Sequence, residues 1–322
     1  MNLEKPKKRR SWLVTLALLI PFLLILAILA AISLNLIRDG KPGLFSKTTE
    51  EPEIQKNYTI DTTGGLTTQE DVVTYMLLGS DYRPESGYRT DVILLVSVNL
   101  KESKVNLLSF PRDLWVNIPG FGEQRINTVQ PYGGYELLSD TLFVNFGFKP
   151  DHYAMVDFEG FKEIVDLLGG IDVKVTQVME DQCEFNAERW CRVEPGVVPM
   201  DSEYALWYVR ARYNSSDFDR TRRAQEVTQA IARKVISFQS IANSSQLIGA
   251  FENSIESDVQ TKDLWPLLIR FGKLTDEDSV TTYAISPNEA TGWITPEGAD
   301  VLLPNYPAIE QILLKVLWIE NP

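Results

Sequence analysis

Arginines and aspartates gather in three short stretches of this chain. The first, LLGSDYRPESGYRTDVILLV, has charged residues of both signs between two apolar runs, and the second, SFPRDLWV, has Arg112 and Asp113 directly after another apolar run. The third, VRARYNSSDFDRTRR, holds five arginines, although the 322-residue chain carries a net charge of −13. Because α/β folds tend to place ligands at the ends of their strands, we expect these side chains to converge. The candidates from the first and third stretches are Asp81, Arg83, Arg89, Asp91, Arg210, Arg212, Arg220, Arg222 and Arg223.

These residue types point to phosphoryl or pyrophosphoryl chemistry. Asp81 and Asp91 stand at the mouths of neighbouring strands and could hold Mg²⁺, which usually binds through one or two carboxylates plus substrate phosphates. Guanidinium groups stay protonated and match phosphate with two parallel hydrogen bonds. In such chemistry, positioning and charge neutralisation supply most of the catalysis. The arginine-rich stretch is therefore interpreted as a clamp for an anion.

Each of these features also has a structural alternative. The two aspartates could form turn salt bridges with neighbouring arginines, and Asp113 could cap the turn that follows it. A run of like charges is usually a solvated face. Arg220 and Arg223 share a helical face whereas Arg222 points elsewhere, so at least one of them is expected in solvent. The sequence has no Walker loop, dinucleotide fingerprint or G-x-S-x-G elbow, which argues against those enzyme classes.

The first 37 residues predict a membrane anchor. Residues 1–10 include five basic residues, and residues 11–37 carry no charge. A bilayer core needs about 20 apolar residues, whereas the apolar region of a secretory signal has about 7–15. Alanines near the end of the run could mimic a cleavage site, which leaves removal of the segment as an alternative. The basic residues predict a single pass through the cell membrane with a cytoplasmic N-terminus. Residues 38–70 then form an extracellular linker and residues 71–322 an extracellular domain.

The cysteines and the charge fit an exterior domain. Cys183 and Cys191 are close in the sequence and are predicted to form a disulfide in an oxidising compartment. With one histidine in the chain, a zinc site is not expected. Residues 1–37 carry a net charge of +4, so the remainder of the chain carries −17. Nucleic acid is therefore excluded as a bulk partner, because binding it needs a dominant positive surface.

The apolar pattern of the domain predicts an α/β fold, because strands and helices are mixed along the chain. A hairpin is expected between the second and third strands. The expected strands cover residues 72–80, 91–100, 104–111, 171–175 and 282–287. The expected helices cover residues 136–146, 159–168, 201–209, 220–240, 264–274 and 307–318.

Four sequence blocks resemble the LytR-CpsA-Psr family in order and spacing. They are LLGSDYRPESGYRTDVILLVSVN, LLSFPRDLWVNIPGFGEQRINTVQPYGG, DHYAMVDFEGFKEIVDLLGGIDVKV and YALWYVRARYNSSDFDRTRRAQE, within a core at residues 71–240. The resemblance implies a mixed central sheet flanked by helices on both faces, a three-layer α/β/α fold with a hydrophobic tunnel for a lipid tail. It also implies a Mg²⁺-dependent phosphotransferase, with Mn²⁺ as a substitute. Such an enzyme moves an anionic glycopolymer from an undecaprenyl pyrophosphate carrier to a peptidoglycan hydroxyl, with pyrophosphatase activity beside transfer.

The resemblance assigns roles to individual residues. Asp81 and Asp91 would be associated with the metal, and Asp91 could alternatively act as the base for the acceptor hydroxyl. The catalytic residues would be Asp91, Arg112, Arg210 and Arg212. The pyrophosphate would be bound by Arg83, Arg89, Arg112, Arg125, Arg210, Arg212, Arg220 and Gln225.

Two positions depart from the family pattern. The family usually has Lys where this chain has Arg125, which keeps the charge but replaces a point charge by a planar fork. The usual Arg-Gln-Gln reads Arg223-Ala224-Gln225 here, so a head-group contact of the first glutamine is either missing or made by Gln225. Two rival functions stay open: a non-catalytic polyprenyl-phosphate-binding sensor of the envelope, and an anchored scaffold domain.

Overall fold

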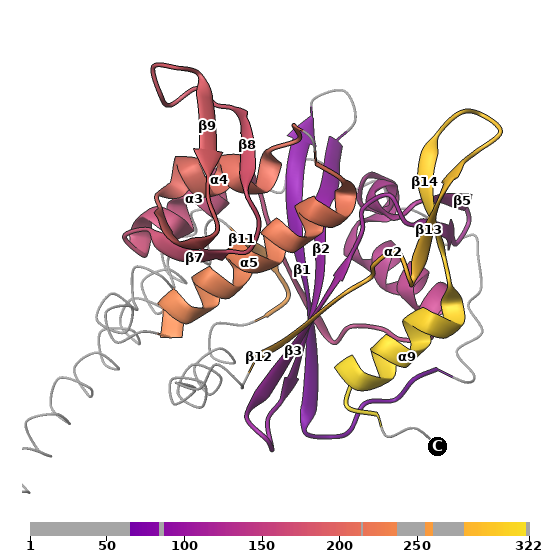
Figure 1. The fold of residues 1–322 in the computed structure, drawn as a ribbon. Helices are drawn as coiled ribbons and strands as arrows, with labels where there is room; N and C mark the ends of the chain where they lie inside the picture. Colours follow the sequence, from indigo (N-terminus) through magenta and orange to yellow (C-terminus); the bar gives the residue numbers. More distant parts are fainter. Residues whose placement is uncertain (1–64, 84–86, 214, 237–254, 260–279, 320–322) are drawn as a thin grey trace, which may run out of the picture. The chain divides into compact units, whose positions relative to one another are not determined.

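The computed structural model of this protein describes residues 65–83, 87–213, 215–236, 255–259 and 280–319 (Figure 1). All of them belong to the unit Glu51–Pro322. Within those ranges, no helix is long and apolar enough to cross a membrane. The predicted anchor, most of the predicted linker and the helix predicted at 264–274 lie outside the described residues.

Six strands form a central mixed sheet. Their order is β11-β6-β1-β2-β3-β12, in which β1–β6 and β3–β12 are parallel and the other pairs are antiparallel. Ile93, Leu94 and Leu95 are each exposed by 1% or less. Both faces of β2 are therefore buried, which explains its continuous apolar run. The predicted hairpin between β2 and β3 is confirmed. The strands are β1 (Val72–Arg83), β2 (Gly87–Asn99), β3 (Lys104–Phe110), β6 (His152–Val156), β11 (Ile255–Ser257) and β12 (Val280–Ala284).

Helices pack against this sheet from both sides (Figure 1). On one side, α2 (Val129–Phe146) and α9 (Tyr306–Val316) share a core with apolar side chains of β1, β2 and β3. On the other side, α3 (Phe158–Leu167) contacts β1, and α5 (Asp217–Ile236) contacts β3 and β12. Helix α4 (Ser202–Arg210) packs on α3 and α5. The predicted α/β fold with a central sheet is therefore confirmed.

Helix α2 begins earlier than predicted. A helix was expected from residue 136, whereas α2 starts at Val129 and is kinked at Gly133 and Gly134. Gly134 has a φ of 60°, which side chains with a Cβ rarely adopt. A Cβ on Gly133 would lie 2.6 Å from the Cβ of Leu137. The glycine pair thus forms a kink inside a helix.

Short strand pairs lie between the larger elements, and one of them carries the predicted site residue Arg125. One pair and a 3-10 turn, η1, connect β3 to α2, and another pair lies between β7 and α4. The pairs are β4 (Trp115–Ile118) with β5 (Gly122–Arg125), β7 (Ile171–Val175) with β10 (Gly196–Met200), β8 (Met179–Gln182) with β9 (Trp190–Val193), and β13 (Ala290–Ile294) with β14 (Asp300–Pro304); η1 is Ile126–Thr128.

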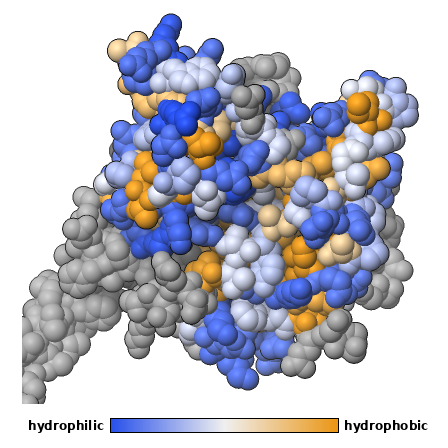
Figure 2. Space-filling model, in the orientation of Figure 1, coloured by the Kyte–Doolittle hydropathy of each residue, from blue (hydrophilic) through white to orange (hydrophobic). Residues whose placement is uncertain are grey.

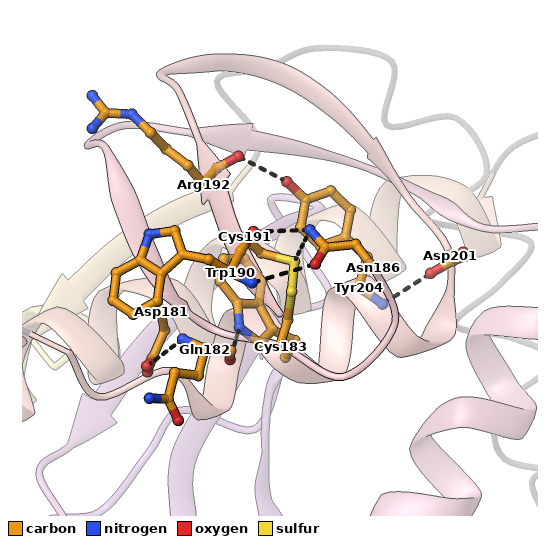
Figure 3. The surroundings of a disulfide bond; sticks show 10 residues. Asp181, Gln182, Cys183, Asn186, Trp190, Cys191, Arg192, Asp201 and Tyr204 are labelled. Carbon is orange, nitrogen blue, oxygen red and sulfur yellow. Dashed lines mark hydrogen bonds between the residues drawn. A yellow bond between two sulfur atoms is a disulfide. The ribbon is translucent and has the colours of Figure 1, made fainter. Parts of the chain in front are cut away.

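A disulfide between Cys183 and Cys191 closes the β8–β9 hairpin (Figure 3). The predicted bond is confirmed. Both sulfur-bearing residues are buried, with 5% and 6% exposed. Within the loop, the side-chain amide of Asn186 donates to the Trp190 carbonyl and accepts from the Trp190 N–H. The tip of the hairpin is therefore held by a disulfide and by two hydrogen bonds between Asn186 and Trp190.

Replacing both cysteines by serine should lower the free energy of unfolding by about 2.5 kcal/mol. The bridge joins residues eight apart, and the constraint that it places on the unfolded chain grows only slowly with loop length. Urea denaturation of the double variant and the wild type would measure the loss. Wild type in a reducing buffer should match the variant, and an unchanged midpoint in both would contradict the prediction.

Candidate functional site

Asp91 occupies a β-bulge in the β1–β2 hairpin. Gly79 pairs with Val92 while Ser80 pairs with Thr90, so Asp91 is the extra residue on β2. A bulge bends its strand and re-aims a side chain, and bulges are frequent beside active sites. Glycine at position 79 leaves space for this bulge. A Cβ on Gly79 would lie 3.0 Å from the Cβ of Val92, which is closer than nearly all such contacts.

Arg112 follows β3 and contacts Asp91 on the neighbouring strand. Ile93 pairs with Phe110, so extending the antiparallel register by two residues brings Arg112 opposite Asp91. Arg112 Nη1 donates to Asp91 Oδ1 at 2.6 Å, and Nε donates to Asp113 Oδ2 at 3.3 Å. Burial lowers the pKa of Arg112, but the hydrogen bonds and charges of the two aspartates raise it more, so the net shift is upward.

The Asp113 carboxylate, 11% exposed, lies among three guanidinium groups. Besides Arg112, its Oδ1 is 3.1 Å from Arg125 Nε and its Oδ2 is 3.9 Å from Arg220 Nη2. Arg125 ends β5 and Arg220 lies in the first turn of α5, so separate segments converge on one carboxylate. The sequence placed Asp113 with Arg112 in one of the three charged stretches, but no site role was assigned to it, and a turn cap was its structural alternative. We term Asp91, Arg112, Asp113, Arg125 and Arg220 the arginine cluster.

The charge of the arginine cluster favours an anionic ligand. Burial and the nearby Arg112 lower the pKa of Arg220 to about 10, Arg212 acts in the same direction, and the two aspartates oppose the shift. Arg220 is therefore still charged at neutral pH, but it is crowded by like charges. An anion placed among these groups would relieve that repulsion. Phosphate and diphosphate are suitable because a guanidinium can donate two parallel hydrogen bonds to them.

The β13–β14 hairpin forms hydrogen bonds to two residues of the arginine cluster. Arg125 Nη2 donates to the backbone oxygen of Asp300 at 2.7 Å, and the N–H of Leu302 donates to the backbone oxygen of Asp113 at 3.0 Å. Leu114 and Leu302 also form a parallel bridge. The segment that carries Arg112 and Asp113 is thus bonded to β2 and to β14.

Arg210 is the last residue of α4, and Arg212 follows two residues later. Both side chains are exposed. The charge of Arg212 contributes to the lowered pKa of Arg220, so the two guanidinium groups repel one another. The contact that the structure describes for Arg210 is different: its Cζ lies 4.3 Å from the centre of the Phe158 ring. This is cation–π geometry, so Arg210 stacks on the start of α3.

Two further arginines of the third stretch hold the fold. Arg222 donates to Glu226 Oε1 at 2.8 Å, one helical turn along α5. Arg223 is fully buried and donates through Nη2 to the backbone oxygen of Ala211 at 2.6 Å. Burial, followed by the charge of Arg222, lowers the pKa of Arg223. The arginine-rich stretch therefore has two parts. Arg220 belongs to the candidate anion-binding site, whereas Arg222 and Arg223 stabilise the fold.

Gln225 and Ala224 also lie in buried surroundings. The Gln225 side chain is 7% exposed, and its Nε2 donates to the backbone oxygen of Tyr283 in β12. Its amide nitrogen is thus bonded to the sheet rather than to a cluster residue. Ala224 is 9% exposed. These positions give no support to Gln225 as a substitute for the missing glutamine.

Asp81, Arg83 and Arg89 are placed by their backbones on the bulged hairpin. The Cα of Asp81 pairs with that of Arg89, and Arg83 pairs with Gly87. Arg89 is half-buried, whereas the side chains of Asp81 and Arg83 lie outside the described part of the structure. The predicted roles of these three residues stay predictions.

The donor set fits magnesium only with help from a substrate. Among the described side chains, no group of three or more His, Cys, Asp or Glu could hold a metal. The Asp91 side chain keeps 27% exposure, and the backbone of Asp81 lies on the adjoining strand. Because Mg²⁺ commonly binds one or two carboxylates plus substrate phosphates and waters, this pair suits that mode rather than an all-protein cage.

The family model LytR_cpsA_psr matches residues 44–315 of this chain. The chain belongs to the LytR-CpsA-Psr family. A LytR-CpsA-Psr relative from Oceanobacillus iheyensis, named polyisoprenyl-teichoic acid–peptidoglycan teichoic acid transferase TagU, is 28% identical over 309 residues, 89% of each chain. The regulatory protein MsrR of Staphylococcus aureus is 28% identical over 209 residues, which is 64% of this chain and 62% of MsrR. The match thus spans about three fifths of MsrR.

Solved structures show the same LytR-CpsA-Psr fold. TagV of B. subtilis has a TM-score of 0.66 at 23% identity, covering 79% of this chain and all of that chain. A structure described as TagT bound to LI-WTA has a TM-score of 0.61 at 23% identity, covering 82% and 96%. Similarity at this level of identity establishes the fold.

Proposed function

We propose that this protein is a phosphotransferase that moves an anionic glycopolymer from a polyprenyl (undecaprenyl) pyrophosphate carrier to a hydroxyl of peptidoglycan. The observation that carries the proposal is the arginine cluster, in which Asp113 joins Arg112, Arg125 and Arg220 beside Asp91. Fixed guanidinium groups suit a diphosphate. The teichoic acid and peptidoglycan in the name of TagU support the classes of donor and acceptor.

In this mechanism the arginine cluster and Arg212 together hold the diphosphate. The acceptor oxygen bonds to the phosphorus next to the sugar, and the bond from that phosphorus to the bridging oxygen breaks. The bridging oxygen leaves on polyprenyl phosphate, which gains a negative charge. Arg112 and Arg220 neutralise that charge as it develops. The hydroxyl proton passes to the Asp91 carboxylate, which lies 2.6 Å from Arg112.

Asp91 has a second role open to it. Mg²⁺, or Mn²⁺ in its place, would be held by Asp91 and Asp81 together with phosphate oxygens. When bound, the ion supplies further neutralisation of the diphosphate charge. In this proposal Asp91 acts either as a metal ligand or as the base that accepts the hydroxyl proton. Water in place of the acceptor hydroxyl would give the accompanying pyrophosphatase activity.

We place the domain outside the cell, anchored by residues 11–37. The uncharged run with basic residues before it supports a cytoplasmic N-terminus. The Cys183–Cys191 disulfide supports an oxidising compartment. This location puts the carrier lipid and peptidoglycan on the same side as the arginine cluster, and the tunnel for the lipid tail stays an expectation.

The full chain in detergent micelles provides the test, with a short polyprenyl pyrophosphate that carries one sugar as the substrate. We expect release of polyprenyl phosphate that stops with EDTA and returns with Mg²⁺ or Mn²⁺. Farnesyl pyrophosphate at about 100 times its Kd should add about 2.7 kcal/mol to the free energy of unfolding. Binding without turnover would instead support an envelope sensor, and absence of both would support a scaffold.

A further inference from the structure

The backbone around Arg212 is held by a carboxylate from another part of the chain. Asp181 Oδ2 accepts the backbone N–H groups of both Arg212 and Tyr213, the second at 3.0 Å. Helix α4 ends at Arg210, and the cap residue Ala211 already has an extended ψ of 138°. The N–H groups of the next two residues therefore have no helical carbonyl, and they need another acceptor.

Asp181 stands on a hairpin that is itself fixed to α4. It lies on β8 opposite Cys191 of β9, so the disulfide closes the hairpin directly beside it (Figure 3). The Trp207 indole of α4 donates to the backbone oxygen of Gln182 at 2.8 Å. The position of the Asp181 carboxylate is thus set by the hairpin, its covalent closure and its contact with the helix that precedes Arg212.

Arg223 also forms hydrogen bonds to the segment around Arg212. Its guanidinium donates to the backbone oxygen of Ala211 at 2.6 Å and to Ser215 Oγ at 2.9 Å. Burial raises the pKa of Asp181, but hydrogen bonds from the N–H groups of Arg212, Tyr213 and Gln182, with the charge of Arg223, lower it more. Asp181 is therefore ionised at neutral pH and forms charge-assisted hydrogen bonds.

We propose that Asp181 is a positioning residue: it fixes the backbone of Arg212 and Tyr213, and thereby the position of the Arg212 guanidinium relative to Arg220. The inference rests on the proposed function, because Arg212 matters only if the arginine cluster binds a diphosphate. Asp181 itself touches backbone N–H groups of the protein. Any effect of Asp181 on the reaction must then pass through the segment that carries Arg212.

A double-mutant cycle on the full chain tests this dependence, with Asp181→Ala, Arg212→Ala and both together. Asp181→Ala should lower kcat/KM about tenfold and Arg212→Ala about 100-fold, and the double variant should be no worse than Arg212→Ala. Asp181→Asn keeps a side-chain oxygen and should lie between wild type and Asp181→Ala. Glu184→Ala, which removes one charge from the same hairpin, should match wild type. Losses that multiply in the double variant would overturn the proposal.

Two further readouts separate this inference from the proposed function and from a general loss of folding. Amide hydrogen exchange at Arg212 and Tyr213 should speed up at least tenfold in Asp181→Ala and stay unchanged in Glu184→Ala. If wild type shows no turnover, the proposed function fails, and the same cycle is measured on farnesyl pyrophosphate binding. Coupled losses of affinity would support the positioning role, and independent losses would overturn it. If Asp181→Ala does not fold, Asp181→Asn takes its place in each measurement.

Discussion

Arg112→Lys should lower kcat/KM about 100-fold, although the charge at this position is kept. The guanidinium donates to Asp91 through Nη1 and to Asp113 through Nε at the same time. A lysine ammonium is a point charge on a flexible stem and cannot reproduce this fork. Each hydrogen bond to a charged group contributes about 1.5–3 kcal/mol, and removing one donor to a developing anion typically lowers rates by roughly 10²–10³. The assay is transfer from sugar-linked polyprenyl pyrophosphate with saturating Mg²⁺.

Arg192→Lys is the matched control for that substitution. Arg192 also joins two carboxylates, with Nε donating to Glu194 at 2.7 Å and Nη1 to Glu180 at 3.1 Å. Its side chain is 55% exposed on β9, outside the arginine cluster, so wild-type rates are expected. An Arg112→Lys protein that keeps the wild-type kcat/KM would contradict the assigned role. A loss confined to KM would mean that Arg112 binds substrate and transition state equally.

The elements were predictable where local signals agree with the fold. Strand β2 has both faces buried, so its apolar run is uninterrupted and visible in the sequence. Helix α3 has Asp157 as a cap that accepts from the N–H of Gly160, and Gly169 follows its end with a φ of 70°. A capping aspartate and a closing glycine are local start and stop signals that agree with the helix expected at 159–168.

The geometry of the site was less predictable, because register and helix orientation are tertiary properties. A period-two pattern carries no sign of the extra residue that makes Asp91 a bulge. The sequence also could not show which face of α5 meets the sheet. That face buries Gln225 against β12, and the same helix buries the charged Arg223 completely. Fully buried arginines are rare, so the sequence alone predicts that each arginine of the stretch contacts solvent or a ligand.

The shared role of Asp113 predicts a large loss of stability for Asp113→Asn. Asparagine keeps the shape but removes the charge that faces Arg112, Arg125 and Arg220. Burial and the charge of Arg112 already lower the pKa of Arg220 to about 10, and the charge of Asp113 opposes that shift. Removing the Asp113 charge would therefore lower the pKa of Arg220 further. We expect the free energy of unfolding to fall by about 3 kcal/mol, the low end for breaking a buried pair. Urea denaturation measures it, with the exposed Asp172→Asn as the control.

The same variant should separate binding from turnover. Loss of Asp113 adds one net positive charge, so the KM for a polyprenyl pyrophosphate should stay the same or fall. The guanidinium groups, however, lose the carboxylate that fixes them, and we expect kcat to fall about tenfold. A diphosphate supplies the negative charge that the variant lacks, so farnesyl pyrophosphate should stabilise Asp113→Asn more than wild type. Equal stabilisation of the two proteins would mean that the ligand does not enter the arginine cluster, and the proposed site would then be wrong.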